Sequence, residues 1–208
     1  VGSGADHDLV GHSGDDVLRG GAGFDWIIGG AGNDTIDGGD DYDFANYDWG
    51  HEDGGTLGID ANLSTGIVTD TFGDTDSLTD IEGVSGSIFN DVMNGNDETN
   101  DLLGREGDDT LNGAGGHDNL EGDQGEDVID GGDGEDRIDG GEDDDTLTGG
   151  AGFDRFIIRS NSGTDTITDF DVGPDGDVID FQLNFGEGMT FDELMANASD
   201  DGTDTTIN

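Results

Sequence analysis

Aspartate residues recur in two stretches of the chain at intervals of nine residues. Two further positions in the same phase hold His7 and Asn100 instead. Carboxylates are preferred ligands of hard divalent cations, and Ca²⁺ takes about six to eight oxygens from carboxylates and backbone carbonyls. The spacing therefore predicts a series of calcium sites. The candidate ligands are Asp16, Asp25, Asp34, Asp43, Asp91, Asp109, Asp118, Asp127, Asp136, Asp145 and Asp154.

Other metals fit these residues less well. Mg²⁺ prefers a rigid octahedral shell and keeps several of its waters. Zinc and copper are bound mainly through histidine and cysteine. This chain has no cysteine, and its four histidines share no ligand spacing. The absence of cysteine also excludes a disulfide framework.

The carboxylates belong to a nine-residue repeat that begins with glycine and carries an apolar residue at its eighth position. Nine is not a helical period, and glycine at this density disfavours helices. Each repeat therefore predicts a six-residue turn followed by a three-residue strand whose middle side chain points inward. Two repeats would close one coil of 18 residues, and successive coils would stack by parallel β pairing.

Stacking of this kind places residues 18 apart above one another, so the aspartates form rows along both edges. Like charges in such rows repel each other unless cations lie between them. A net charge of −48 and a hydrophobic content of 29% are typical of a disordered chain unless something neutralises it. A disordered acidic tail or a halophilic surface is the alternative, but neither needs a fixed nine-residue phase.

Composition and motifs also exclude several functions. Five arginines against 53 acidic residues leave no basic face for nucleic acid. No apolar run reaches the roughly 18 residues of a membrane-spanning helix, so no membrane insertion is expected. His51-Glu52 lacks a second histidine at the metalloprotease spacing. Asp15 follows Gly11-His-Ser-Gly14 where a nucleophile elbow needs glycine. We therefore expect no catalytic residue.

The pattern Gly-Gly-x-Gly-x-Asp-x-(apolar)-x resembles the nonapeptide of the repeat-in-toxin, or hemolysin-type, calcium-binding family. Its clearest copies are residues 20–28, 29–37 and 131–139. Residues 81–91 look like the family's usual lead-in to an array, and residues 163–170 with 177–181 are similar to the segment after the last repeat. The resemblance implies an all-β, right-handed parallel β-roll with two repeats per coil. It also implies calcium ions along both edges, and type I secretion from a bacterium to the extracellular space.

Carried over position by position, the resemblance implies that each ion is held by two turns one coil apart. The sixth-position aspartates of both turns contribute together with turn carbonyls, which gives about eight candidate sites. Asp41 and Asp143 replace fourth-position glycines, and aspartate tolerates a left-handed backbone better than most residues. The turn glycines assigned to the sites are Gly14, Gly23, Gly30, Gly32, Gly107, Gly116, Gly125, Gly132, Gly134, Gly150 and Gly152.

The repeats divide the chain into four parts. Residues 1–46 form a first calcium-binding array and residues 86–157 a second. Residues 47–85 are a β-rich insertion that either extends the roll or bridges two separate stacks. Residues 158–208 are expected to cap the roll with strands and one short helix around residues 191–198. The whole chain is expected to be tethered to further domains of a longer protein.

Aromatic residues gather in the first array. Phe24 and Tyr42 occupy fifth positions one coil apart, and Trp26 and Phe44 occupy outward seventh positions one coil apart. Two interpretations stay open: a face that binds sugar or another partner, or a local core covered by the insertion.

Two classes of function fit these features. The first is a calcium-binding module that folds outside the cell and serves secretion, folding and stabilisation of a larger exported bacterial protein. The alternative is a non-catalytic support or glycan-binding module of a secreted protease, lipase or polysaccharide-modifying enzyme, or a segment of a surface adhesin. Extracellular polysaccharide would be a partner in the alternative. What precedes Val1 would discriminate between them.

Overall fold

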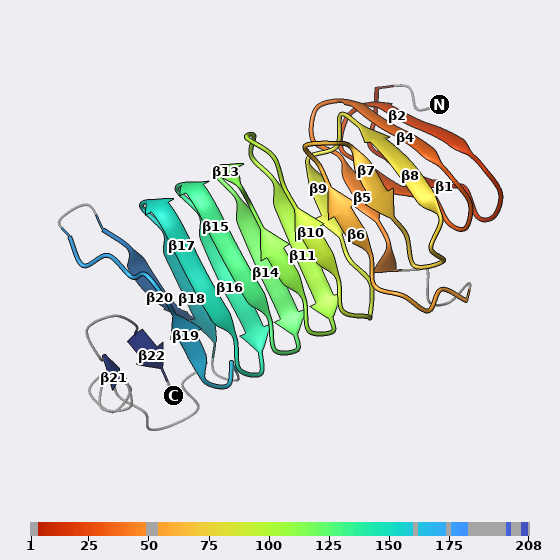
Figure 1. Ribbon diagram of the computed structural model, residues 1–208. Helices are drawn as coiled ribbons and strands as arrows, with labels where there is room; N and C mark the ends of the chain where they lie inside the picture. The colour runs from red at the N-terminus through yellow and green to blue at the C-terminus, as the bar shows by residue number, and fades with distance from the viewer. Residues whose placement is uncertain are drawn as a thin grey trace.

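The structure is a computed structural model, and it describes residues 4–48, 54–159, 162–173 and 176–182, together with the backbone of residues 199–200 and 205–207. Apart from a 3₁₀ conformation at Asp48, every regular element in these ranges is a β-strand. The strands form two long sheets that face each other in a parallel β-solenoid (Figure 1). This confirms the predicted all-β roll. Among the described segments, no helix is long and apolar enough to cross a membrane.

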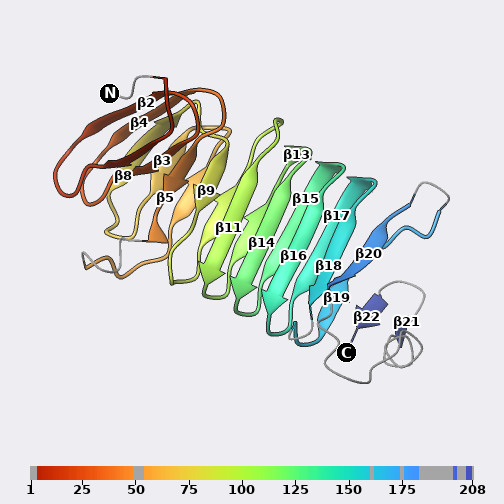
Figure 2. The same cartoon turned by 180° about the vertical axis from the view of Figure 1, so that it is seen from behind.

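One sheet has nine strands, and its neighbours all pair in parallel. Figure 2 shows this sheet from the side on which β11, β14 and β16 follow one another. In spatial order its strands are β1 (His7–Val10), β3 (Asp25–Ile28), β5 (Phe44–Asn46), β9 (Gly83–Ser85), β11 (Asp101–Glu106), β14 (Asn119–Gln124), β16 (Arg137–Glu142), β18 (Arg155–Arg159) and β20 (Val178–Gln182).

The opposite sheet has 13 strands, and the short strand β13 (Gly115–Gly116) pairs with one of them, β15. The order of the others is β2 (Val17–Ala22), β4 (Thr35–Asp40), β8 (Thr75–Thr79), β7 (Ile67–Thr69), β6 (Asp60–Asn62), β10 (Val92–Asn94), β12 (Thr110–Asn112), β15 (Val128–Gly134), β17 (Thr146–Gly152), β19 (Asp165–Ile167), β22 (Thr205–Ile207) and β21 (Ser199–Asp200).

The register confirms the predicted coil of 18 residues. Leu9 pairs with Ile27 across β1 and β3, and Leu111 pairs with Ile129 across β12 and β15. The eighth-position side chains from Ile27 to Phe156 are buried between the sheets. One buried aliphatic side chain contributes roughly 1.5–3 kcal/mol, whereas ordering nine residues costs roughly 1–2 kcal/mol for each. The apolar core alone therefore does not offset the cost of ordering a repeat.

The insertion extends the roll unequally on its two sides. In the nine-stranded sheet, β5 pairs directly with β9 through Phe44 and Gly83. In the other sheet, β8, β7 and β6 lie between β4 and β10, and β7 pairs antiparallel with both of its neighbours. Both sheets therefore continue through the two arrays. The extra strands on one side coincide with a change in strand direction between the first and the later coils (Figure 1).

The C-terminal part continues the two sheets before the pattern changes. β19 and β20 add one parallel strand to each sheet, and β22 then pairs antiparallel with β19. The short helix expected around residues 191–198 lies outside the described residues.

Candidate metal centres

The sixth-position aspartates form two hydrogen-bonded rows, one at each edge of the roll. In each row, the backbone N–H of one residue donates to Oδ1 of the aspartate one coil further on. At the edge that leads into the 13-stranded sheet, the donor–acceptor pairs are Asp16 to Asp34 (2.8 Å), Asp91 to Asp109 (2.7 Å), Asp109 to Asp127 (2.8 Å) and Asp127 to Asp145 (3.0 Å).

The opposite edge repeats the arrangement. The pairs there are His7 to Asp25, Asp25 to Asp43, Asn100 to Asp118 and Asp118 to Asp136, each at 2.8 Å, and Asp136 to Asp154 at 3.0 Å. His7 occupies the first place of this row, and its Nδ1 also lies 2.8 Å from Oδ1 of Asp25. The structure thus brings together all the aspartates that the sequence predicts to lie one coil apart.

The second carboxylate oxygen of most row members is buried without a hydrogen-bond partner. This holds for Oδ2 of Asp25, Asp34, Asp43, Asp109, Asp118, Asp127, Asp136 and Asp145. An unpaired buried polar atom costs about 1–3 kcal/mol, and more if it is charged. A cation between two successive carboxylates would satisfy both, so the donor set fits calcium.

Burial makes the charged form of these carboxylates costly. Desolvation raises the pKa of Asp109 to about 8, and the nearby charges of Asp91 and Asp127 act in the same direction. Desolvation likewise raises the pKa of Asp145 to about 8 and that of Asp118 to about 7. A divalent cation would reverse this balance, because it favours the deprotonated form.

Glycine is needed where the turns of adjacent coils touch. At Gly30 the backbone has φ +99°, and a Cβ atom would collide with the carbonyl oxygen of His12 in the neighbouring coil. At Gly104, a first position, a Cβ atom would collide with Oδ2 of Asp109. The glycines therefore allow carbonyls and carboxylates to approach each other closely.

Ten of the predicted turn glycines have positive φ, namely Gly14, Gly23, Gly30, Gly32, Gly107, Gly116, Gly125, Gly132, Gly150 and Gly152, whereas Gly134 ends β15. Asp41 and Asp143 adopt φ +80° and +77° in place of fourth-position glycines, as expected.

No group of three or more His, Asp or Glu side chains converges as a metal site within the described ranges. Two carboxylates from successive coils are the side-chain donors available at each place. The remaining oxygens would come from turn carbonyls, and the carbonyl contribution stays a prediction.

Four residues that the sequence did not assign continue the rows. The N–H groups of Asp34, Asp145 and Asp154 donate to Oδ1 of Asp76 (2.9 Å), Asp165 (3.3 Å) and Asp177 (3.1 Å), respectively, and the N–H of Asp43 donates to Oε2 of Glu82 (2.9 Å). The three aspartates each stand two residues before Leu78, Ile167 or Ile179. This Asp-x-aliphatic triplet remains at places where most of the repeat's glycines are missing. It is the sequence signal by which these three aspartates could have been found.

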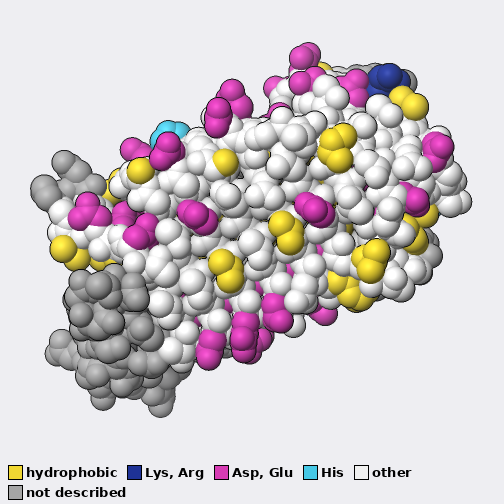
Figure 3. Space-filling view, in the orientation of Figure 1, with side chains coloured by type: hydrophobic (Ala, Val, Ile, Leu, Met, Phe, Trp, Pro, Cys, Tyr) yellow, Lys and Arg dark blue, Asp and Glu magenta, His cyan; other side chains and the backbone are white. Residues whose placement is uncertain are grey.

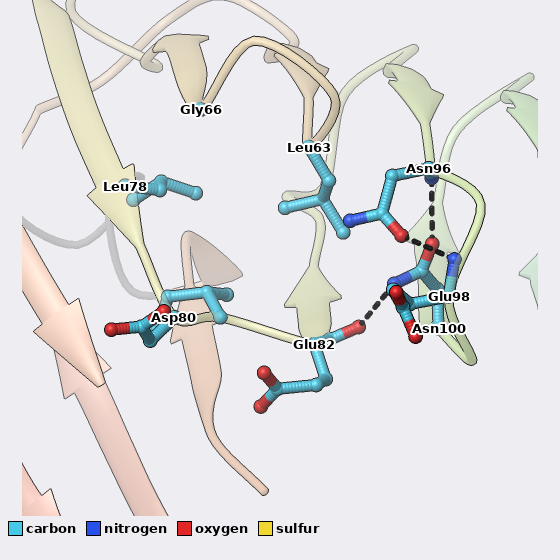
Figure 4. A pocket seen from close by; sticks show the side chains of 9 residues that line it. Leu63, Gly66, Leu78, Asp80, Glu82, Asn96, Glu98 and Asn100 are labelled. Carbon is cyan, nitrogen blue, oxygen red and sulfur yellow. Dashed lines mark hydrogen bonds between the residues drawn. The ribbon is translucent and has the colours of Figure 1, made fainter. Parts of the chain in front are cut away.

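One row is interrupted where the two arrays meet. Glu82 and Asn100 stand there, and the Asn100 amide donates to the Glu82 carbonyl oxygen at 3.3 Å. A cavity of about 210 Å³ opens beside them, lined also by Asp80, Glu98 and Leu63 (Figure 4). Because the amide donor occupies the space between the two turns, this junction differs from the regular carboxylate pairs.

The aromatic residues of the first array form one cluster. The ring of Phe44 lies 4.8 Å from that of Trp26 and 5.7 Å from that of Phe24, and Tyr42 is 5.9 Å away. Phe44 is buried over Gly83, whereas Phe24 is 43% exposed. The insertion strands β6, β7 and β8 belong to the opposite sheet.

Acidic side chains also cover the surface. Figure 3 shows them across the visible face, with a group along the lower edge of the view. The net charge of −48 therefore has both a buried part, in the rows, and an exposed part.

Comparison with known proteins agrees with this geometry. A family model described as RTX calcium-binding nonapeptide repeat, in four copies, matches residues 10–45, 85–120 and 121–156. These ranges contain all the row aspartates that the sequence predicts as calcium ligands. No curated protein matches the chain.

Proposed function

The chain belongs to the family of RTX calcium-binding nonapeptide repeats, and from this premise we propose that it is a calcium-binding β-roll module that folds when it meets calcium outside the cell. The observation that carries the proposal is the set of buried Oδ2 atoms without a protein partner in both rows. The carboxylates of successive coils would hold each ion, and the ion would replace the water that these carboxylates lose on folding.

Calcium binding would supply the free energy that the small core lacks. A ligand that binds only the folded state adds roughly 4 kcal/mol per site at 1,000 times its dissociation constant. Because the sites need two adjacent coils, the unfolded chain has none of them. Binding free energy then becomes folding free energy. Without calcium, the charge of −48 favours the expanded chain.

This coupling suits export from a bacterial cell. Bacterial cytosol holds little free calcium, so the chain would stay unfolded and could pass through a narrow channel. Calcium outside the cell is near millimolar, which is about 1,000 times a micromolar dissociation constant, so sites of that affinity would each add roughly 4 kcal/mol there. We therefore assign the chain to a larger exported protein, with the type I secretion machinery as its partner and a non-catalytic role in folding and stabilisation.

A circular-dichroism titration tests the folding switch. The chain is stripped with EDTA and titrated with calcium, and a parallel sample is titrated with magnesium. We expect a cooperative change from coil to β-sheet near millimolar calcium and no such change with magnesium. The proposal would be contradicted if the chain is already folded in EDTA, or if its circular-dichroism spectrum does not change when calcium is added.

The aromatic cluster supports a second role, the binding of extracellular polysaccharide by a module of a secreted enzyme or adhesin. Trp26 stacks on Phe44 at an interplanar angle of 25°, and Phe24 beside them remains 43% exposed. An exposed aromatic ring next to a rigid sheet can stack on the apolar face of a sugar. A polysaccharide pull-down compares the folded chain with its Trp26→Ala variant, and equal retention of both would exclude this role for the cluster.

A further inference from the structure

Asp70 is a buried carboxylate that lies outside the repeats. It follows β7 in the turn that leads to β8, and its exposed fraction is 1%. Its Oδ1 accepts hydrogen bonds from the backbone N–H groups of Phe72 (2.9 Å) and Asp74 (2.8 Å). Its Oδ2 is buried and has no hydrogen-bond partner. Asp70 thus has the same two-oxygen arrangement as the row aspartates, although it stands on an antiparallel hairpin.

The hairpin register places Asp70 on the same face as Asp76. Val68 pairs with Asp76 across β7 and β8, and alternation along β7 turns Asp70 to the side of Val68. All three side chains are buried. Asp76 belongs to the row, because its Oδ1 accepts the N–H of Asp34. The carboxylate row of the first array therefore continues into the hairpin.

The hydroxyl of Tyr47 lies beside these carboxylates and comes from the other sheet, because Tyr47 directly follows β5. It donates to Oδ2 of Asp76 at 3.1 Å. The phenol oxygen that donates this hydrogen bond has a lone pair left for a cation.

No arginine or histidine among the described residues forms an ion pair with these carboxylates, Asp34, Asp70 and Asp76. A buried unpaired carboxylate is strongly unfavourable.

We propose that Asp70 and Asp76, with the Tyr47 hydroxyl beside them, hold a further calcium ion that fastens the β7–β8 hairpin to the first array. The donors are all oxygens, which suits a hard divalent cation. The inference rests on the proposed calcium-dependent function and adds one site that the nonapeptide pattern does not predict. The insertion would then fold together with the arrays at the same calcium concentration.

Native mass spectrometry of the chain at saturating calcium counts the bound ions. Asp70→Asn keeps an oxygen that can accept the Phe72 and Asp74 amides and removes the charge. We expect this variant to bind one ion fewer than the wild type. Asp60→Asn is the matched control, because it removes an exposed carboxylate from β6 of the same insertion. Its ion count should equal that of the wild type.

The outcomes separate this inference from the proposed function. If the wild type binds no calcium, the proposed function fails. If the wild type binds calcium and Asp70→Asn retains the full count, only the additional site is refuted. If Asp70→Asn does not fold, Tyr47→Phe decides, since it keeps the buried ring and both carboxylates. We expect Tyr47→Phe to need several-fold more calcium to fill one site, and an unchanged titration would overturn the inference.

Discussion

Replacing Asp127 by asparagine is the most direct perturbation of the carboxylate rows. Oδ1 of Asp127 accepts the N–H of Asp109 at 2.8 Å, while its Oδ2 is buried without a partner. Asparagine retains the acceptor and puts an amide nitrogen where the cation needs an oxygen. Asp127 stands between Asp109 and Asp145, so the substitution affects two proposed sites at once.

We expect Asp127→Asn to lower the free energy of unfolding strongly in calcium and to raise it when calcium is absent. At calcium concentrations 1,000 times the dissociation constant, one site contributes roughly 4 kcal/mol, so two sites contribute roughly 8 kcal/mol. In EDTA, burial raises the pKa of Asp127 to about 7. Removing this carboxylate then relieves an unfavourable charge, and any residual fold should become more stable.

Urea unfolding at saturating calcium and in EDTA measures both effects. Glu126→Gln is the matched control, because it removes an equal charge from an exposed fifth position next to the row. We expect its free energy of unfolding to change by less than about 0.5 kcal/mol. The proposed role of the rows would be refuted if the two variants lost equal stability in calcium, or if Asp127→Asn destabilised the chain equally in both conditions.

Three further predictions concern pH, the turns and the core. In EDTA, β-structure followed by circular dichroism should increase as the pH falls from 8 to 5, because the raised pKa values of Asp109 and Asp145, about 8, favour folding in the protonated form. In calcium titrations, the same fall in pH should move the folding midpoint to a higher calcium concentration. If the β-structure in EDTA does not change with pH, this prediction is wrong. Gly30→Ala should lower the calcium-bound melting temperature, since its φ of +99° and the His12 carbonyl exclude a Cβ atom, whereas Ala31→Gly should have a smaller effect; equal shifts would argue against the close turn contact. Ile129→Ala should cost about 2–5 kcal/mol in urea unfolding, and Val128→Ala, at a side chain that is 49% exposed, less than about 1 kcal/mol; similar losses would mean that the eighth positions do not form the core.

Much of the regular roll could be predicted from the sequence because its contacts are periodic. Leu111 and Ile129 are one coil apart, and the same phase places Asp109 below Asp127. When every coil has 18 residues, one local spacing determines both the core and the carboxylate rows. The left-handed backbone of Asp41 and Asp143 followed from their place in the same frame.

The row members whose spacing departs from 18 residues could not be predicted from this periodicity. Asp34 and Asp76 are 42 residues apart, yet the N–H of one donates to the carboxylate of the other. Asp165 and Asp177 extend the rows without a glycine at the first position of the repeat, although Gly163 keeps the fourth position before Asp165. Their neighbours depend on the lengths of the connecting segments, which a repeat pattern does not encode.

The sequence by itself therefore determined the coil, the inward apolar residues and the identity of most row aspartates, because those features depend on local spacing. Only the tertiary structure decided that the insertion adds antiparallel strands to one sheet, that Asp70 lies on the same hairpin face as Asp76 and Tyr47 donates to Asp76, and that one oxygen of most row aspartates accepts a backbone N–H while the other stays unpaired. These features depend on which strands become neighbours across long loops and on how far water is excluded between them, and both are properties of the assembled sheets.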